Sequence, residues 1–331
     1  MQPLTRFKPS TASSTATYHK PYVSLPRSRK PAVGNRKRNG RRRPILTLKA
    51  FIAAHDYSRL IEYAKYPPRR DSVRVAHTVV DELCDDGVYP YANNSAARIA
   101  WAEIAADEGR RFLKTAPDLG FFFGTLTLAE FMVPYKDAKI LDLNKVQESA
   151  RRRFKGLNFV GIVEPALYTR TAQLDRPGRY ICWHVHFVAW DVSSNRIRKA
   201  RDRINRNNVS AVPGIKPAHY RPLETEEEVL SAIFYMFKGP QSDHRVYARV
   251  EEWAEPETGE LRKRPTGRYT QAKGPLRLGD AARMANLLEG IRLDELVFAN
   301  GREGRALLKR IVDRALAPLR AYESRKLGRR R

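Results

Sequence analysis

Two histidines separated by a single residue are the most chemically suggestive feature of the sequence. His184 and His186 flank Val185 in an apolar run over residues 181–188 that has the composition of a β-strand. Alternate side chains of a strand point to the same face, so the two imidazoles would lie side by side and could chelate one divalent ion. The other interpretation of the pattern is a pair of half-buried structural histidines.

A carboxylate in the preceding predicted strand, residues 158–169, could complete a metal site. If the turn between the strands is centred near residue 175 or 176, Glu164 faces the neighbourhood of residue 186 or 188, and paired residues share a face. One carboxylate and two imidazoles with open positions suit Mg²⁺ or Mn²⁺. Glu164 could instead be a surface carboxylate. Cys182 has the parity of the two histidines and offers a competing Cys-His-His zinc site.

A tyrosine and a lysine three residues apart form a second group that could do chemistry. Tyr235 and Lys238 lie in a predicted amphipathic helix over residues 226–238, on the flank of its apolar stripe and about 60° apart. A tyrosine hydroxyl can attack phosphorus to form a covalent ester, and a lysine beside it could activate the phenol or balance the phosphate charge. The alternative is an interfacial tyrosine with a solvated lysine.

The elements that would position these groups alternate between strands and helices. Strands are predicted over residues 121–128, 158–169, 179–190 and near 215–221, and helices over 142–154, 194–206 and 226–238. A turn signal at residues 175–178 joins two of the strands as a hairpin, so the sheet is at least partly antiparallel. We therefore expect an α+β fold with a central, mostly antiparallel sheet, flanking helices, and helical additions at both ends.

The flanking regions differ in composition from this core, which we place at residues 118–240. Residues 1–55 hold thirteen Lys or Arg and no acidic residue, and we expect residues 1–45 to be a disordered basic tail. Residues 46–117 read as a helical module. Residues 241–331 read as a basic, mainly helical region, in which a polar stretch marked by Pro and Gly leads to helices near 278–289 and 303–324.

Charge points to a nucleic-acid partner. The chain of 331 residues has 62 Lys and Arg against 36 Asp and Glu, a net charge of +26. Such a surface repels itself unless a polyanion is near, and DNA and RNA are common polyanions. A merely soluble basic protein, or one that touches anionic membranes, is the alternative. We expect phosphate contacts from the tail and from the helix that starts at Ser194, through Arg36, Lys37, Arg38, Arg41, Arg42, Arg43, Arg196, Arg198, Lys199, Arg201 and Arg203.

The remaining composition suggests a cytoplasmic protein. There are two cysteines, too few for a disulfide framework, which favours a reducing cytosol. No run of 18 apolar residues predicts a membrane span, and no apolar stretch follows the basic N-terminus as in a secretory signal. We expect no membrane partner.

Three motifs together resemble the HUH endonuclease superfamily, and more closely the single-tyrosine initiators of rolling-circle replication. They are, in order, Thr125-Leu126-Thr127-Leu128, His184-Val185-His186 and Tyr235-Met236-Phe237-Lys238. The resemblance covers residues 118–240 and implies a sheet-centred fold related to RNA-recognition domains. It implies His184, His186 and a third polar residue, here Glu164, as ligands of Mg²⁺ or Mn²⁺, with Tyr235 as nucleophile and Lys238 as its helper.

The same resemblance implies an activity. It is site-specific nicking and joining of single-stranded DNA through a 5′-phosphotyrosine, which initiates rolling-circle replication of a plasmid or phage-like element. Origin DNA is the expected partner, together with a host helicase and polymerase, because the chain has no Gly-x-x-x-x-Gly-Lys-Ser/Thr loop for a helicase of its own. The alternatives are a transposase or relaxase of the same superfamily, a non-catalytic nucleic-acid-binding module, and a cupin-like metal oxidoreductase.

Overall fold

The computed structural model describes residues 44–67, 73–115, 119–171 and 178–328. From Pro44 onward the chain forms one compact unit. The expected tail, residues 1–45, falls almost wholly outside the described residues. So do the six basic residues assigned to it, Arg36, Lys37, Arg38, Arg41, Arg42 and Arg43.

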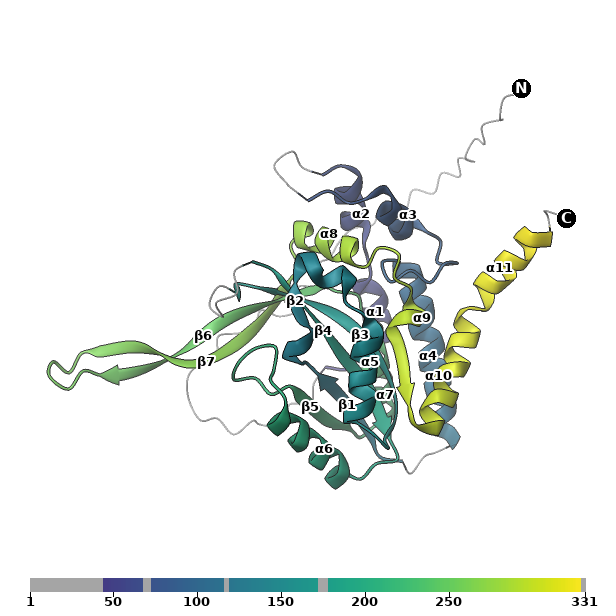
Figure 1. Ribbon diagram of the computed structural model, residues 1–331. Helices are drawn as coiled ribbons and strands as arrows, with labels where there is room; N and C mark the ends of the chain where they lie inside the picture. Colours follow the sequence, from purple (N-terminus) through teal and green to yellow (C-terminus); the bar gives the residue numbers. More distant parts are fainter. Residues whose placement is uncertain (1–43, 68–72, 116–118, 172–177, 329–331) are drawn as a thin grey trace. The chain divides into compact units, whose positions relative to one another are not determined.

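In the described part of the chain, eight strands form one curled sheet (Figure 1). Its main path runs through β5 (Ala218–Leu223), β1 (Phe121–Leu126), β4 (Tyr180–Trp190), β3 (Asn158–Thr169), β6 (Ser242–Ala254) and β7 (Leu261–Pro275). Two short strands pair off this path, β2 (Met132–Pro134) with β4 and β8 (Val297–Asn300) with β3. All pairings are antiparallel except that of β3 with β6, so the mostly antiparallel sheet expected from the sequence is confirmed.

Helices flank this sheet and also form the N- and C-terminal additions (Figure 1). The N-terminal ones are α1 (Leu48–Ala54), α2 (Ser58–Lys65), α3 (His77–Cys84) and α4 (Ser95–Thr115). Within the core lie η1 (Ala129–Phe131), η2 (Tyr135–Ile140), α5 (Leu143–Arg153), α6 (Ser194–Asn207) and α7 (Glu226–Phe237). The C-terminal ones are α8 (Leu278–Leu287), α9 (Leu293–Leu296), α10 (Gly301–Ala315) and α11 (Ala317–Gly328). The α+β class is therefore confirmed.

Side-chain caps explain where the core helices begin. The hydroxyl of Thr225 accepts a hydrogen bond from the backbone N–H of Glu228 at the start of α7, and three glutamates follow in its first turn. Ser193 caps α6, and Asp142 caps α5, in the same way. These local signals place each helix within one or two residues of the boundary predicted from the sequence.

The two faces of β4 carry different chemistry. Val185 and Phe187 point to one face, where Phe187 packs against Phe154 and Phe159 with ring centroids 4.6 and 5.1 Å away. Val188 and Trp190 point to the same face of β4 as the two histidines, and they lie against apolar residues of α4, α7 and α10. Helix α7 thus crosses the face of the sheet that bears the two histidines.

The hairpin of β6 and β7 was not predicted from the sequence. Its two strands, of 13 and 15 residues, run out from the sheet as an arm (Figure 1). Only the root is buried, at Asp243, His244 and Val246, whereas most residues from Ala248 to Arg268 are exposed. Because both faces of the arm meet solvent, its strands lack the apolar alternation by which a half-buried strand is recognised.

Candidate metal centre and nucleophile

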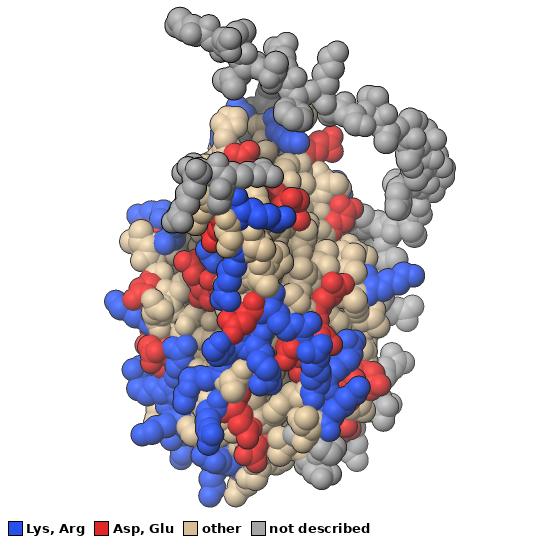
Figure 2. Space-filling view, turned by 90° about the vertical axis from the view of Figure 1, so that its right-hand side faces the viewer, with Lys and Arg blue, Asp and Glu red and all other residues tan. Residues whose placement is uncertain are grey.

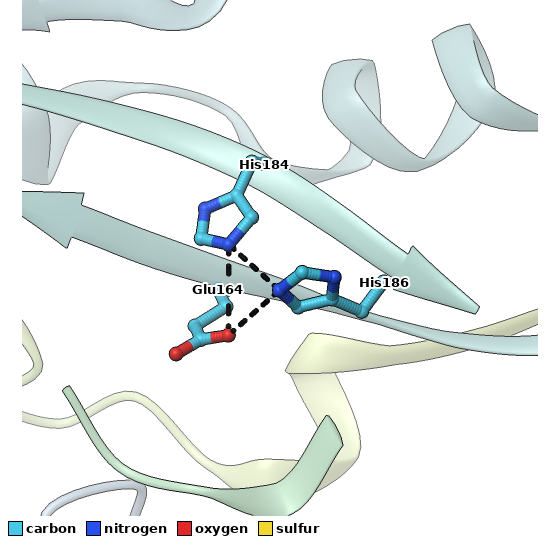
Figure 3. A group of neighbouring side chains, drawn as sticks. All are labelled: Glu164, His184 and His186. Carbon is cyan, nitrogen blue, oxygen red and sulfur yellow. Dashed lines mark hydrogen bonds and ion pairs between the residues drawn. The ribbon is translucent and has the colours of Figure 1, made fainter. Parts of the chain in front are cut away.

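Glu164, His184 and His186 form a compact buried group in the sheet (Figure 3). Glu164 comes from β3 and the histidines from β4, and each side chain exposes less than a tenth of its surface. The Nε2 atoms of the two histidines are 3.0 Å apart. Glu164 Oε2 lies 3.6 Å from His184 Nε2 and 3.3 Å from His186 Nε2. All three side chains therefore present a ligand atom to one small volume.

The register between β3 and β4 differs from the one expected. Glu164 pairs directly with His184, not with residue 186 or 188. The prediction of its partner was wrong because the true pairing places the centre of the hairpin nearer the N-terminus than residue 175. The shift is an even number of residues, so Glu164 keeps the face of the two imidazoles.

The neutral forms of the two histidines can offer their Nε2 lone pairs to a metal ion. Burial lowers the pKa of both His184 and His186, so both rings are neutral near pH 7. His184 Nδ1 lies 3.4 Å from the carbonyl oxygen of Cys182, which can accept a hydrogen bond from the tautomer protonated on Nδ1. Thr125 Oγ1 lies 3.0 Å from His186 Nδ1 and can orient that ring in the same sense. Neutral imidazoles oriented in this way are the form that binds metals.

The geometry of the three atoms fits a divalent cation. An ion about 2.1 Å from two neighbouring ligands holds those ligand atoms about 3.0 to 3.4 Å apart. The separations of 3.0 and 3.3 Å fall within this range, and the third, 3.6 Å, lies slightly beyond it. Glu164 Oε2 is also buried and has no hydrogen-bond donor assigned to it, although His186 Nε2 lies 3.3 Å away. A cation would satisfy this oxygen and the two nitrogen lone pairs together.

Lys238 balances the charge of Glu164. Its ammonium is ion-paired with Glu164 Oε1, and both side chains are largely buried. Burial alone would raise the pKa of Glu164, but Lys238 and the neighbouring imidazoles outweigh it and hold the pKa well below its usual range. Burial likewise acts to lower the pKa of Lys238, and the carboxylate reverses the effect and raises it. The carboxylate therefore stays ionised, as a metal ligand must.

Tyr235 lies beside the same group. Its ring stands edge-on to His186, with centroids 5.1 Å apart, and edge-on to Phe123, with centroids 5.6 Å apart. The Lys238 ammonium lies 4.6 Å from the centre of the Tyr235 ring. The tyrosine is half-buried, so the site is not sealed from solvent. The structure thus brings together all five residues that the sequence assigned to catalysis and metal binding.

The end of α7 is held in place from the N-terminal helices. Arg98 of α4 is buried and donates hydrogen bonds to the carbonyl oxygens of Phe237 and Lys238, at 3.1 and 3.2 Å. The backbone N–H of Gly239 donates to His55 Nε2 at 3.1 Å. A cation on the last carbonyls of a helix satisfies groups that have no partner within the helix. These contacts fix the turn that carries Tyr235 and Lys238.

Cys182 does not join the metal group, so the Cys-His-His zinc site is ruled out in this arrangement. Among the described residues, the group that could hold a metal consists of Glu164, His184 and His186. Cys182 packs in an apolar cluster with residues such as Met132, Val212 and Val246. Burial raises the pKa of its thiol to about 12. A neutral thiol in apolar surroundings is a packing residue.

The basic residues predicted on α6 lie on the other side of the sheet. Arg201 stacks over Tyr220, which has the parity opposite to that of the histidine face. Arg196 and Arg203 donate to the backbone carbonyls of Gly156 and Arg153. Arg198 and Lys199 are exposed on the same helix. These five residues can contact a polyanion on the face of the sheet opposite to the one that bears Tyr235.

Other basic residues were missed by sequence reasoning. Lys273 of β7 donates a hydrogen bond to the hydroxyl of Tyr235 at 3.2 Å, and Arg221 of β5 lies 5.5 Å from the ring centre of Phe123, which stacks on His186. The side of the molecule formed by α4, α10 and α11 is rich in Lys and Arg (Figure 2). On α10 and α4 the exposed ones include Arg302, Arg305, Lys309, Arg110 and Lys114. Lys273 and Arg221 lie far in the sequence from the residues of the site, so no local pattern marked them as part of it.

Comparisons of the chain with protein-family models, with curated proteins and with solved structures gave no match. Within the described ranges, every helix is too short or too polar to cross a bilayer.

Proposed function

We propose that this protein nicks and rejoins single-stranded DNA through a phosphotyrosine formed on Tyr235. The observation that carries the proposal is the contact between the Tyr235 ring and His186, beside a buried Glu-His-His group that fits a divalent cation. A phenol next to such a group can attack a phosphodiester whose oxygen the cation holds. The net charge of +26 and the basic side of the molecule suit a nucleic-acid substrate (Figure 2).

The chain's own residues have separate parts in this reaction. Glu164, His184 and His186 would hold Mg²⁺ or Mn²⁺, which when bound polarises a phosphate oxygen and stabilises the developing charge. The hydroxyl oxygen of Tyr235 forms a bond to phosphorus as the bond from phosphorus to the 3′ oxygen breaks. The tyrosine proton goes to solvent and the departing oxygen takes a proton from solvent. Lys238 keeps Glu164 ionised and packs over the nucleophile's ring.

The products explain why no nucleotide-binding loop is needed for joining. A 5′-phosphotyrosine conserves the energy of the broken bond, so a 3′-OH can attack it and reseal the strand. The free 3′-OH can also prime synthesis, which is the chemistry of rolling-circle initiation on a plasmid or phage-like element. We place this reaction in the cytoplasm, where a host helicase and polymerase would extend the nicked strand.

An oligonucleotide assay tests the proposal. Wild-type protein is incubated with a pool of single-stranded oligonucleotides and Mg²⁺ or Mn²⁺, and covalent adducts are separated on denaturing gels. Mass spectrometry should place the nucleotide on the peptide that contains Tyr235. Tyr235→Phe should form no adduct, whereas Tyr247→Phe, at a half-buried tyrosine of β6, should react like the wild type.

Two results would count against the proposal. An adduct on Tyr235→Phe would show that another residue is the nucleophile. If the wild type binds the oligonucleotides but forms no adduct with either ion, the chain is better described as a non-catalytic nucleic-acid-binding module.

A further inference from the structure

Two lysines contact Tyr235, and they contact different parts of it. Lys238 lies over the ring, 4.6 Å from its centre, and its ammonium is ion-paired with Glu164. Lys273 lies at the hydroxyl end, because its ammonium is 3.2 Å from the hydroxyl oxygen and 5.9 Å from the ring centre. The charge of Lys238 is thus engaged by a carboxylate, whereas that of Lys273 is directed at the atom that would react.

The sheet fixes Lys273 at this point. In the β6–β7 pairing Lys273 lies opposite His244, and in the β3–β6 pairing His244 lies beside Tyr168. The His244 and Tyr168 rings are stacked with centroids 4.9 Å apart, and both are buried. Because β3 also carries Glu164, one continuous set of strands places both the metal ligand and Lys273.

The ammonium of Lys273 has N–H donors that the Tyr235 hydroxyl does not use. It is exposed to solvent, and within the described ranges no carboxylate lies at ion-pair distance from it. An ammonium has three N–H donors, and the Tyr235 hydroxyl uses one. The remaining donors can bind an anion that arrives at the hydroxyl oxygen.

We propose that Lys273 is a further catalytic residue, which holds the Tyr235 hydroxyl before attack and then binds a non-bridging oxygen of the phosphate that Tyr235 acquires. The inference rests on the proposed nicking function. Once the tyrosine oxygen is bonded to phosphorus, the non-bridging oxygens are one bond further on, within reach of an ammonium already 3.2 Å from that oxygen. The cation at Glu164, His184 and His186 would bind one non-bridging phosphate oxygen, and Lys273 would bind another.

The step balances with solvent as the only further reactant, since the tyrosine proton goes to solvent and the departing 3′ oxygen takes a proton from solvent. The bond between the tyrosine oxygen and phosphorus forms, and the bond between phosphorus and the 3′ oxygen breaks. Lys273 keeps its three protons throughout and supplies charge and hydrogen bonds. In the reverse direction it stays with the phosphate until the tyrosine oxygen leaves, and then returns to that oxygen.

Three variants separate this role from general charge effects. Lys273→Met removes the ammonium, Lys273→Arg restores a cation, and Lys263→Met removes an exposed lysine from a distant part of the same strand. At saturating oligonucleotide, the rate of adduct formation should fall about 100-fold in Lys273→Met, the usual effect of losing one donor to a developing anion. Lys273→Arg should recover part of the rate, and Lys263→Met should keep it.

A substrate change shows whether the lost contact is to the phosphate. A methylphosphonate at the nicked position replaces one charged oxygen with a methyl group. Wild type should react more slowly with the matching methylphosphonate isomer than with the phosphate, and Lys273→Met should lose most of that discrimination. A merely structural role would slow both substrates equally.

The outcomes distinguish this inference from the function on which it rests. If the wild type forms no adduct, the proposed function fails and the role of Lys273 fails with it. If the wild type reacts and Lys273→Met reacts at the same rate, or loses the same factor on both substrates, only the role of Lys273 is overturned. Because Lys273 is exposed, its variants should melt like the wild type.

Discussion

The ring of Tyr235 stands edge-on to the ring of His186, with 5.1 Å between their centroids. One residue comes from the last turn of a helix and the other from the middle of a strand. Their contact places a phenol next to two imidazole nitrogens and a carboxylate.

Thr125 should tune the metal affinity through His186. Its hydroxyl lies 3.0 Å from His186 Nδ1, and partners of this kind orient the ring of a metal ligand. Thr125→Val should lower the affinity for Mn²⁺ by about tenfold or more, measured by isothermal titration calorimetry. Thr127→Val, at a hydroxyl that bonds to the carbonyl of Pro217, is the matched control. Equal affinities for the two variants would contradict this role.

Removal of Lys238 should destabilise the protein when no metal is present. Lys238→Met leaves the buried Glu164 carboxylate without its cation, and breaking a buried ion pair in this way costs about 3 kcal/mol or more. Urea unfolding in the presence of EDTA measures the loss. Lys309→Met breaks an exposed pair with Asp313 and should change the free energy of unfolding by less than about 1 kcal/mol.

The same pair supplies a stricter check. The double variant Lys238→Met, Glu164→Gln removes both charges, so it should be more stable than Lys238→Met alone. If the double variant is less stable by the sum of the two single effects, the buried pair is not the source of the loss.

Stability should fall in mild acid because of buried neutral histidines. Burial lowers the pKa of His244 to about 3, with the nearby Lys273 and Lys238 acting in the same direction, whereas an unfolded histidine titrates near pH 6.5. Between these values the unfolded chain binds a proton that the folded chain does not, so stability is lost as the pH falls below about 6.5. His244→Phe should weaken this loss.

The pH dependence is measured by unfolding wild type and His244→Phe at a series of pH values from about 7 to about 4.5. The phenyl ring can keep the stacking on Tyr168. His77→Gln, at an exposed histidine, should leave the wild-type dependence unchanged. Identical slopes for wild type and His244→Phe would show that His244 is not among the groups responsible.

The arm should be dispensable for folding. Residues from Val250 to Pro265 are almost all exposed, and an isolated two-stranded ribbon adds little stability. Replacing residues 250–265 with an Asn-Gly turn should therefore leave the melting temperature within about 2 °C of the wild type. A fall of many degrees would show that the distal arm packs on the body of the protein.

Features within one element were predictable from the sequence. Side chains two apart in a strand share a face, so His184 and His186 had to point the same way wherever their strand lay. The cap and apolar stripe of α7 located Tyr235 in the last turn of the helix, whereas Lys238, predicted as the last helical residue, is the extended residue that follows it. The turn signal between β3 and β4 predicted that these two strands pair antiparallel. Each of these follows from backbone geometry over a few residues.

Contacts between elements were decided only by the tertiary structure. The pairing of Glu164 with His184, the placement of α6 on the far face of the sheet, and the hydrogen bond from Lys273 to Tyr235 join residues distant in sequence. These contacts depend on the register of the strands and on which faces of the elements pack together. Neither can be derived from a pattern of residue types within one short segment. Lys273 lies at the root of the β6–β7 hairpin, opposite the buried His244, and the exposed strands beyond this root lack the apolar alternation of a half-buried strand.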